Sequence, residues 1–311
     1  MENIIHLYKL QFQLYIMSNL KFSGHDTFHC RQQWLLKGFE LIDNKNLRGF
    51  YNLEEAILEL GVGKNMVQAI QYWIRAFGLV DEDKKLTEIA RTLFSADKGF
   101  DRYLEDEGTL WLLQYLICNE DIASIYKLIF SDFTNERISN EFDERQIINF
   151  IKVKIAESSS RETSKNTLSS DFKVFIQSYF SGVRTLKSLE DDFNSPLIEL
   201  NLISSISREN GVITYKLNKE NRSDFPLEIF GYCLFDLYGN NSAIQFKDIR
   251  KTLGSYFVIS NEGLEIIIEN LCKKYSEFIF NDDAGIRQIQ IKAISEDFKF
   301  NLLQNYYRRG L

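Results

Sequence analysis

The chain has 311 residues, of which 44% are hydrophobic and 26% are charged, a composition typical of a globular protein. Its formal net charge of −7 excludes a uniformly basic nucleic-acid-binding protein, so any contact with DNA has to come from a local basic surface. Most of the acidity lies in the middle of the chain, where residues 101–160 carry twelve Asp and Glu against six Lys and Arg. The length indicates two or three domains.

Four cysteines occur far apart in the sequence, at Cys30, Cys118, Cys233 and Cys272. Because none of them forms a CxxC pair, the sequence favours reduced thiols over a disulfide framework or a zinc finger. Residues 1–16 lack the basic start and the cleavage site of a signal peptide and are too interrupted to span a bilayer, and Met17 is a second candidate for the first residue. We therefore expect a cytoplasmic protein without membrane contact.

The segment after residue 50 has the order of elements of a winged helix-turn-helix. Apolar residues recur at helical spacing over residues 53–60 and 64–77, and Asn52 is a plausible N-cap of the first of these helices. A glycine-rich turn, Gly61 to Gly63, separates the two helices, and two short strands flanking the polar tip 81–85 follow them. The second helix of such a unit is normally the one that reads DNA.

The predicted helix over residues 64–77 has one polar side, consisting of Lys64, Asn65, Gln68, Gln71, Tyr72 and Arg75. Asn and Gln can bond adenine edges, and Lys and Arg can bind guanine or phosphate. The alternative is a solvated helix face in a domain that binds protein.

The remaining sequence predicts helices over residues 104–133, 146–155 and 167–180, followed by a C-terminal part in which helices again precede a hairpin. We therefore predict a mainly α protein with small β-wings. Its predicted parts are an N-terminal extension (1–19), a winged-helix domain (20–100), a helical domain (101–195) and a C-terminal winged-helix-like domain (196–311).

Residues 22–31 contain the highest concentration of side chains able to bind a metal ion or act in catalysis, and a helix is expected to begin there near Asp26 or Thr27. His25 and His29 are four residues apart, so on a helix both imidazoles would lie on one face and could share a metal ion. Asp26 could bind magnesium or act as a general base. The alternative is structural, with Asp26 or Ser23 capping the helix and the histidines bonded to backbone groups.

Two further charged clusters have structural alternatives. Glu105, Asp106 and Glu107 could bind a divalent metal ion, but acidic residues also favour the first turn of a helix. Arg287 lies beside a predicted hairpin turn and could meet a phosphate.

Several motifs occur in the order typical of one bacterial family of unknown function. They are FSGHDTFHCRQQWLLKG (22–38), LGVGKNMVQAIQYWIRAFGL (60–79), YLEDEGTLWLL (103–113), NTLSSDFKVFIQSY (166–179), SPLIELNLI (195–203) and DDAGIRQIQ (282–290). The chain resembles this family over roughly residues 20–305. It departs from the family pattern at Asp26, where Glu is frequent, and at Gln71, where Arg is frequent, and the second change removes a positive charge from the predicted reading helix.

The resemblance implies a role in phage-defence gene clusters that place sulfur in the DNA backbone, where SspB-type members are described as DNA-nicking proteins. It implies double-stranded DNA and the other subunits of a sulfur-modification complex as partners. Nicking requires an activated water and stabilisation of the phosphate, usually by a metal ion such as Mg²⁺ or Mn²⁺. His25, Asp26 and His29 are the candidate catalytic residues, with Asp26 as the metal ligand. The candidate DNA-binding residues are Arg31, Lys64, Asn65, Gln68, Gln71, Arg75 and Arg287.

Two alternatives to a DNA-nicking subunit remain. One is a non-catalytic adaptor that docks the sulfur-transfer partners, for which the acidic middle segment is suited. The other is a winged-helix transcription regulator, which would bind a palindrome as a homodimer.

Overall fold

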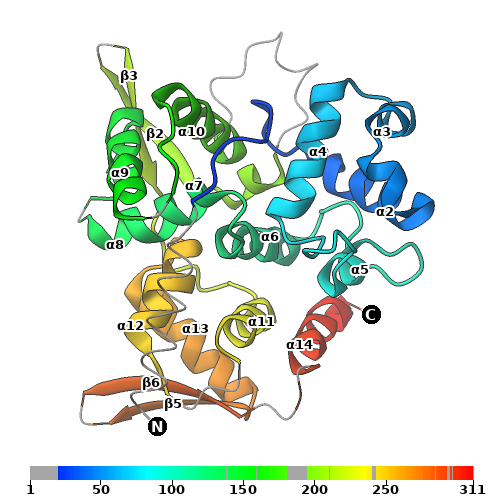
Figure 1. Ribbon diagram of the computed structural model, residues 1–311. Helices are drawn as coiled ribbons and strands as arrows, with labels where there is room; N and C mark the ends of the chain where they lie inside the picture. Colours follow the sequence, from blue (N-terminus) through cyan, green and yellow to red (C-terminus); the bar gives the residue numbers. More distant parts are fainter. Residues whose placement is uncertain are drawn as a thin grey trace.

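The computed structural model describes residues 20–310 except 138, 159, 181–194, 210, 240–242, 284, 293–294 and 296. The protein is mainly helical and has two small antiparallel sheets (Figure 1). The predicted N-terminal extension, residues 1–19, lies outside the described residues. No helix within the described ranges is long and apolar enough to cross a bilayer.

Four helices form the first part of the described chain: α2 (Gln32–Tyr51), α3 (Leu53–Leu60), α4 (Lys64–Ala76) and α5 (Glu88–Phe94). Asn52 caps α3 as predicted, since its side chain accepts a hydrogen bond from the backbone N–H of Glu54. Gly61 ends α3 in a left-handed conformation (φ 63°), and its N–H donates to the carbonyl of Ile57. Between α4 and α5, Val80 and Leu86 form an isolated antiparallel bridge. The predicted order of helix, turn and helix is therefore present, and a single bridge stands where two short strands were predicted.

The expectation that a helix begins near Asp26 or Thr27 is wrong, because α2 begins at Gln32. Both Asp26 and Thr27 have positive φ angles, 47° and 67°, which a right-handed helix cannot contain. Neither Asp26 nor Ser23 therefore caps this helix, and His25 and His29 do not share a helix face.

Six helical segments of the middle part follow: α6 (Glu107–Asn119), α7 (Ser124–Lys127), the π-helical turn η1 (Leu128–Phe133), α8 (Thr134–Glu136), α9 (Glu144–Glu157) and α10 (Lys165–Tyr179). Asp106 is the N-cap of α6, and its side chain accepts hydrogen bonds from the N–H groups of Gly108 and Thr109. This confirms the structural interpretation of the acidic cluster at residues 105–107.

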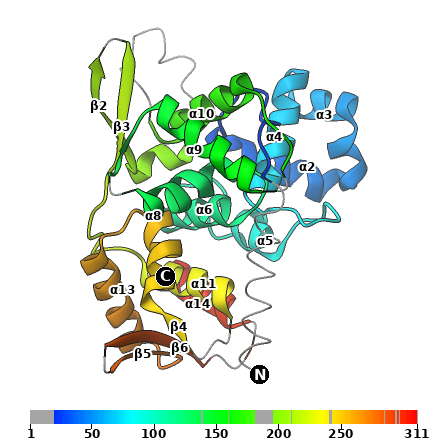
Figure 2. The ribbon, with the colours of Figure 1, turned by 60° about the vertical axis from the view of Figure 1, so that its left-hand side comes forward.

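The first sheet has the order β1–β3–β2, with β1 (Glu141–Phe142), β2 (Ile203–Glu209) and β3 (Val212–Leu217) antiparallel. The 3₁₀ turn η2 (Pro196–Leu200) precedes it. Because β1 comes from the middle part and β3 from the C-terminal part, this sheet joins residues on both sides of position 195. The β2–β3 hairpin projects away from the helices (Figure 2).

The C-terminal part begins with α11 (Leu227–Tyr238), β4 (Ile244–Gln245), α12 (Phe246–Ile249), the π-helical turn η3 (Arg250–Gly254) and α13 (Asn261–Lys274). It continues with the hairpin of β5 (Phe278–Asp283) and β6 (Ile286–Ile291), then α14 (Phe298–Tyr307) and the 3₁₀ turn η4 (Arg308–Gly310). The second sheet has the order β4–β6–β5, so the hairpin pairs with the short strand that precedes α12.

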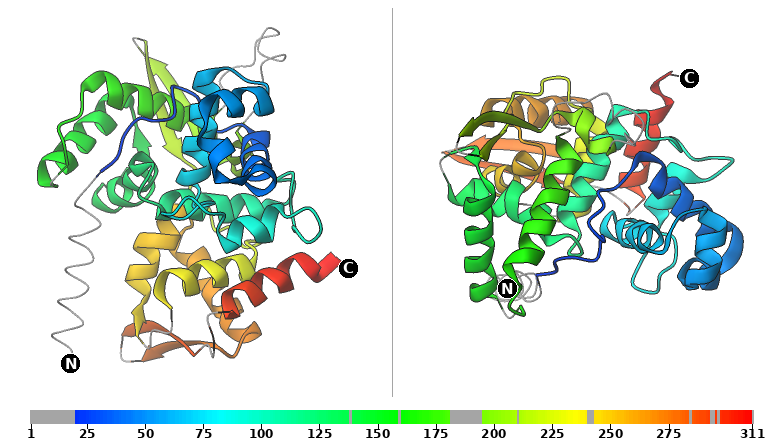
Figure 3. Two further views of the ribbon diagram at one scale, coloured as in Figure 1. Left: turned by 45° about the vertical axis from the view of Figure 1, so that its right-hand side comes forward. Right: turned by 90° about the horizontal axis from the view of Figure 1, so that it is seen from above.

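The buried apolar side chains form one cluster that extends from Cys30 to Leu303. The last helix contributes to it by packing against both α11 and the first half of the chain (Figure 3). Tyr307 stacks on Phe100 with 4.8 Å between ring centroids, and its hydroxyl lies 2.7 Å from Thr109 Oγ1. The C-terminal helix therefore ties α6 and the segment after α5 to the C-terminal part.

Candidate functional site

Residues 23–27 form a strained loop. Positive φ angles occur at Ser23 (69°), Gly24 (102°), Asp26 (47°) and Thr27 (67°). Left-handed backbone costs residues other than Gly roughly 1–2 kcal/mol each, and it persists only where surrounding contacts hold it. Gly24 is required for a second reason, because a Cβ atom there would lie 2.8 Å from Tyr72 Cδ2. Such strain often marks a functional site.

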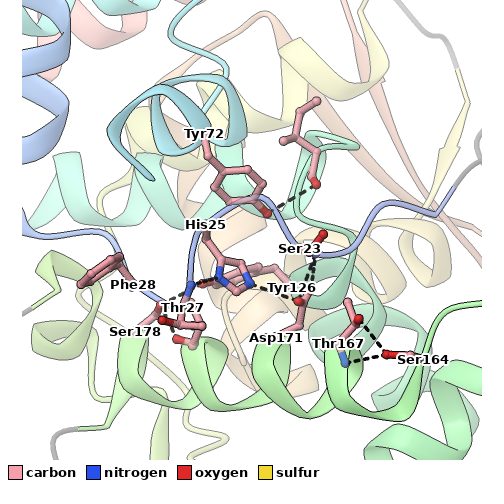
Figure 4. Close-up of polar contacts among 12 residues, drawn as sticks. Ser23, His25, Thr27, Phe28, Tyr72, Tyr126, Ser164, Thr167, Asp171 and Ser178 are labelled. Atoms are coloured by element: carbon pink, nitrogen blue, oxygen red, sulfur yellow. Dashed lines mark hydrogen bonds and ion pairs between the residues drawn. The ribbon is translucent and has the colours of Figure 1, made fainter. Parts of the chain in front are cut away.

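The contacts that hold this loop centre on His25 and on Asp171 of α10, which are 4% and 2% exposed (Figure 4). His25 Nε2 lies 3.1 Å from Asp171 Oδ1, and the backbone N–H of Thr27 donates to His25 Nδ1 at 3.1 Å. Because Nδ1 accepts a hydrogen bond, the neutral ring carries its proton on Nε2 and donates it to Asp171. Asp171 also accepts from the N–H of Ser23, at 3.0 Å to each carboxylate oxygen. Both ring nitrogens of His25 are thus used in fixing the loop.

Aromatic side chains of α4 pack against the His25 ring. The ring lies edge-on to Tyr72, with 5.6 Å between centroids, and is stacked with Trp73 at 6.3 Å. The indole N–H of Trp73 donates to the carbonyl of Phe28 at 3.1 Å, which holds the other end of the segment. Burial raises the pKa of Tyr72 well above its usual range, and the negative charge of Asp171 raises it further. Tyr72 is therefore a neutral packing residue, and the expectation that it lies on the polar side of α4 is wrong.

Asp26 lies between His25 and Thr27, which are both anchored, and its own side chain is partly exposed. Its Oδ2 atom is buried and has no hydrogen-bond partner within the described ranges of the chain. A buried acceptor without a partner costs roughly 1–3 kcal/mol, so the position calls for a ligand or a functional explanation.

The other two candidates of this segment, His29 and Arg31, are partly buried and make interactions within the protein. The guanidinium carbon of Arg31 lies 5.3 Å from the ring centroid of Trp34. Neither residue shares a hydrogen bond with His25 or Asp26 among the contacts described.

Sequence reasoning missed Asp171, which is 146 residues away from His25 in the chain. The signal that could have found it is the family motif NTLSSDFKVFIQSY, in which Asp171 is the only acidic residue.

A second candidate surface is the α4 polar face, which we define as Lys64, Asn65, Gln68 and Arg75, all four exposed. The sequence of α4 contains no acidic residue. Its N-cap is Gly63, which supplies no side-chain cap, so the first N–H groups of the helix point outward without a side-chain acceptor.

Gln71, another candidate DNA-binding residue, lies partly buried at the edge of this face. Its side-chain amide donates to the carbonyl of Phe50 at 2.6 Å and so links α4 to the end of α2. Gln71 is therefore engaged within the protein.

Arg287 lies on β6 and forms ion pairs with Glu265 and, at 3.4 Å, with Asp282. Its guanidinium carbon is also 4.4 Å from the ring centroid of Phe246. The pKa of Arg287 is raised, mainly by its interaction with the Glu265 carboxylate. These contacts place Arg287 inside an acidic and aromatic cluster of the C-terminal part, away from α4.

The residues of the loop fit a magnesium ion only at Asp26. No group of three or more His, Cys, Asp or Glu side chains that could hold a metal ion occurs in the part of the chain that the structure describes. His25 has no free nitrogen, so of the two interpretations of His25 and His29 the metal shared by both is excluded by the contacts of His25. Magnesium, however, is usually held by one or two carboxylates together with waters and substrate phosphates, and the unpartnered oxygen of Asp26 belongs to a group of that type.

Residues 22–307 match the family described as "Protein of unknown function (DUF4007)", and the chain belongs to that family. No curated protein matches it.

Two solved structures share the fold. The structure titled "SspB crystal structure" superposes with a TM-score of 0.80 at 23% identity, covering 94% of this chain and 90% of that one. "Magnesium ion-bound SspB crystal structure" also has a TM-score of 0.80, at 24% identity, covering 93% of this chain and 88% of that one. The protein therefore has the SspB fold along nearly its whole length.

Proposed function

We propose that this protein is a DNA-binding subunit of a DNA phosphorothioate-modification system and that it contacts double-stranded DNA through the α4 polar face. The proposal rests on the exposed, acid-free side of α4. It is supported by the family membership and by the likeness to SspB, a protein of such systems.

The surrounding elements suit this role. Helix α3, the glycine turn, α4 and the bridged pair Val80 and Leu86 have the order of a winged helix-turn-helix, in which α4 would be the reading helix. The uncapped N-terminus of α4 offers backbone N–H groups and a partial positive charge to a phosphate.

The C-terminal part has a comparable order of elements but a different surface. The helix that corresponds to α4 is α13, and Glu262, Glu265 and Glu269 lie on its solvent side. A phosphate backbone would be repelled there, so we assign DNA contact to α4 and not to α13.

Replacing Lys64 and Arg75 together by alanine is expected to weaken binding to a double-stranded oligonucleotide by about tenfold or more and to reduce the salt slope by about 2, since each cation accounts for roughly one phosphate contact. Fluorescence anisotropy across a salt series measures both quantities. Lys273→Ala is the matched control, because Lys273 is an exposed lysine on the acidic helix α13. Salt-independent or absent DNA binding by the unmodified protein would favour the adaptor instead.

Magnesium-dependent DNA nicking is a second candidate activity, favoured by the strained loop and by the unpartnered oxygen of Asp26. Asp26 would hold the ion together with waters and DNA phosphates. When bound there, the ion would supply stabilisation of charge on the phosphate and an activated water. His25 and Asp171 act as positioning residues, because they fix the backbone on both sides of Asp26 through Thr27 and Ser23.

A further inference from the structure

A cavity of about 230 Å³ lies where the middle helices meet the C-terminal part. Its wall comes from α8 and the segment before β1, from the end of β3, and from η3 with the residues that follow it. Helices α8 and α12 lie on the side of the molecule away from α4 (Figure 1), and no residue of α4 or of residues 23–27 lines the cavity. The cavity is therefore separate from both surfaces described above.

Three cationic residues line this cavity, Arg137, Lys219 and Arg250, and no acidic residue does. None of the three forms an ion pair with any other residue whose position is described. The acidic neighbours in sequence are already paired, Glu136 with Lys154 and Glu220 with Arg222. Among the described residues, no carboxylate therefore pairs with the three cations that line the cavity.

The environment of Lys219 reflects this excess of positive charge. Its pKa is lowered, first by burial and then by the positive charge of Arg250. A bound anion would reverse the second effect, since it offsets the repulsion between the two cations.

Hydrogen bonds connect the segments that form the wall of this cavity. The carbonyl of Lys251 in η3 accepts hydrogen bonds from Ser131 Oγ at 2.8 Å and from Asn135 Nδ2 at 2.9 Å, which joins η3 to η1 and α8. Val258, also in the wall, has a φ of 52°, which is an outlier for a β-branched residue. Its carbonyl accepts from the N–H of Glu220, so this strained position is held to the strand that leads to Lys219.

We propose that this cavity is a phosphate-binding site whose ligands are Arg137, Lys219 and Arg250. Two arginines and a lysine among the lining residues of one small cavity suit a phosphate oxyanion, because guanidinium forks bind phosphate oxygens in pairs. The cavity is smaller than typical small-molecule pockets, which exceed roughly 300 Å³, so it has room for a single phosphate group. That group belongs either to a free phosphate compound or to a nucleic-acid backbone.

The test is isothermal titration calorimetry of the full chain with inorganic phosphate and with a nucleoside monophosphate. Arg250→Ala and Lys219→Ala are each expected to weaken phosphate binding by about tenfold or more. Lys251→Ala is the matched control, since Lys251 is an exposed lysine of η3 whose side chain does not line the cavity, and it should stay within about twofold of the unmodified protein. Circular dichroism checks that each variant is folded.

A second arm distinguishes the two sources of the phosphate by measuring binding of a double-stranded oligonucleotide in the Lys64→Ala, Arg75→Ala background. If Arg250→Ala weakens DNA binding there and phosphate competes with DNA, the group comes from the backbone. If DNA binding does not change, it comes from a free phosphate compound. Absence of phosphate binding, or an equal loss in Lys251→Ala, would overturn the proposal without bearing on the α4 polar face.

Discussion

Asp171→Ala is expected to lower the free energy of unfolding by about 3 kcal/mol or more, because it leaves one buried and one partly buried donor without an acceptor. These donors are the Nε2–H of His25 and the backbone N–H of Ser23. The strained backbone from Ser23 to Thr27 would also lose the contacts that hold it. Urea unfolding followed by the fluorescence of Trp73, which is stacked with His25, measures the loss.

Asp171→Asn should fall between the unmodified protein and Asp171→Ala, since the amide oxygen still accepts one hydrogen bond while the charge is lost. Lys173→Ala is the control on the same helix, because Lys173 is exposed and its removal is expected to change stability by less than about 0.5 kcal/mol. If Asp171→Ala were no less stable than Lys173→Ala, the loop would be held by other contacts.

Asp26→Asn is expected to reduce magnesium-dependent nicking of supercoiled plasmid by about 100-fold or more while DNA binding and stability are retained. Stability should survive for two reasons. Asn tolerates the left-handed backbone at this position, and the Oδ2 atom that becomes an amide makes no hydrogen bond to any described residue. Gel electrophoresis of plasmid incubated with magnesium or manganese measures nicking.

Asp83→Asn provides the matched control, because Asp83 is an exposed acidic residue in the same N-terminal part. His25→Ala separates positioning from catalysis, since it should lower stability and nicking together. Full nicking by Asp26→Asn would remove Asp26 from the chemistry. An absence of nicking by the unmodified protein would leave the DNA-binding or adaptor role.

The sequence was most informative where local rules decide the structure. The cap at Asn52, the glycine-rich turn from Gly61 to Gly63 and the apolar spacing of residues 64–77 predicted α3, the turn after it and α4 correctly. Capping, glycine turns and helical periodicity all act within a few residues. The same holds for the acidic cluster before α6: of its two interpretations, the start of a helix agrees with the structure, where Asp106 is the N-cap.

Local rules failed at the segment that carries most of the chemistry. The spacing of His25 and His29 suggested one helix face, whereas Asp26 and Thr27 adopt left-handed backbone conformations. This backbone conformation is held by contacts from outside the segment, with Asp171 of α10 and with the aromatic rings of α4. Because these partners are distant in sequence, local sequence patterns cannot reveal them. Tyr72 was likewise misplaced by local spacing: it lies on the side of α4 expected to be polar, but the loop of residues 23–27 packs against it and buries it.

The sequence by itself determined the helical class, the position of the turn between α3 and α4, and membership of a family through motifs spread along the chain. Only the tertiary structure decided which of the candidate groups are available. In the folded protein both nitrogens of His25 make hydrogen bonds, and Arg287 is paired with acidic residues. One oxygen of Asp26 has no partner among the described residues. Arg137, Lys219 and Arg250 line one cavity. The physical reason is that the availability of a side chain depends on its burial and on its partners, which packing decides and local spacing does not; for His25 the partner is 146 residues away.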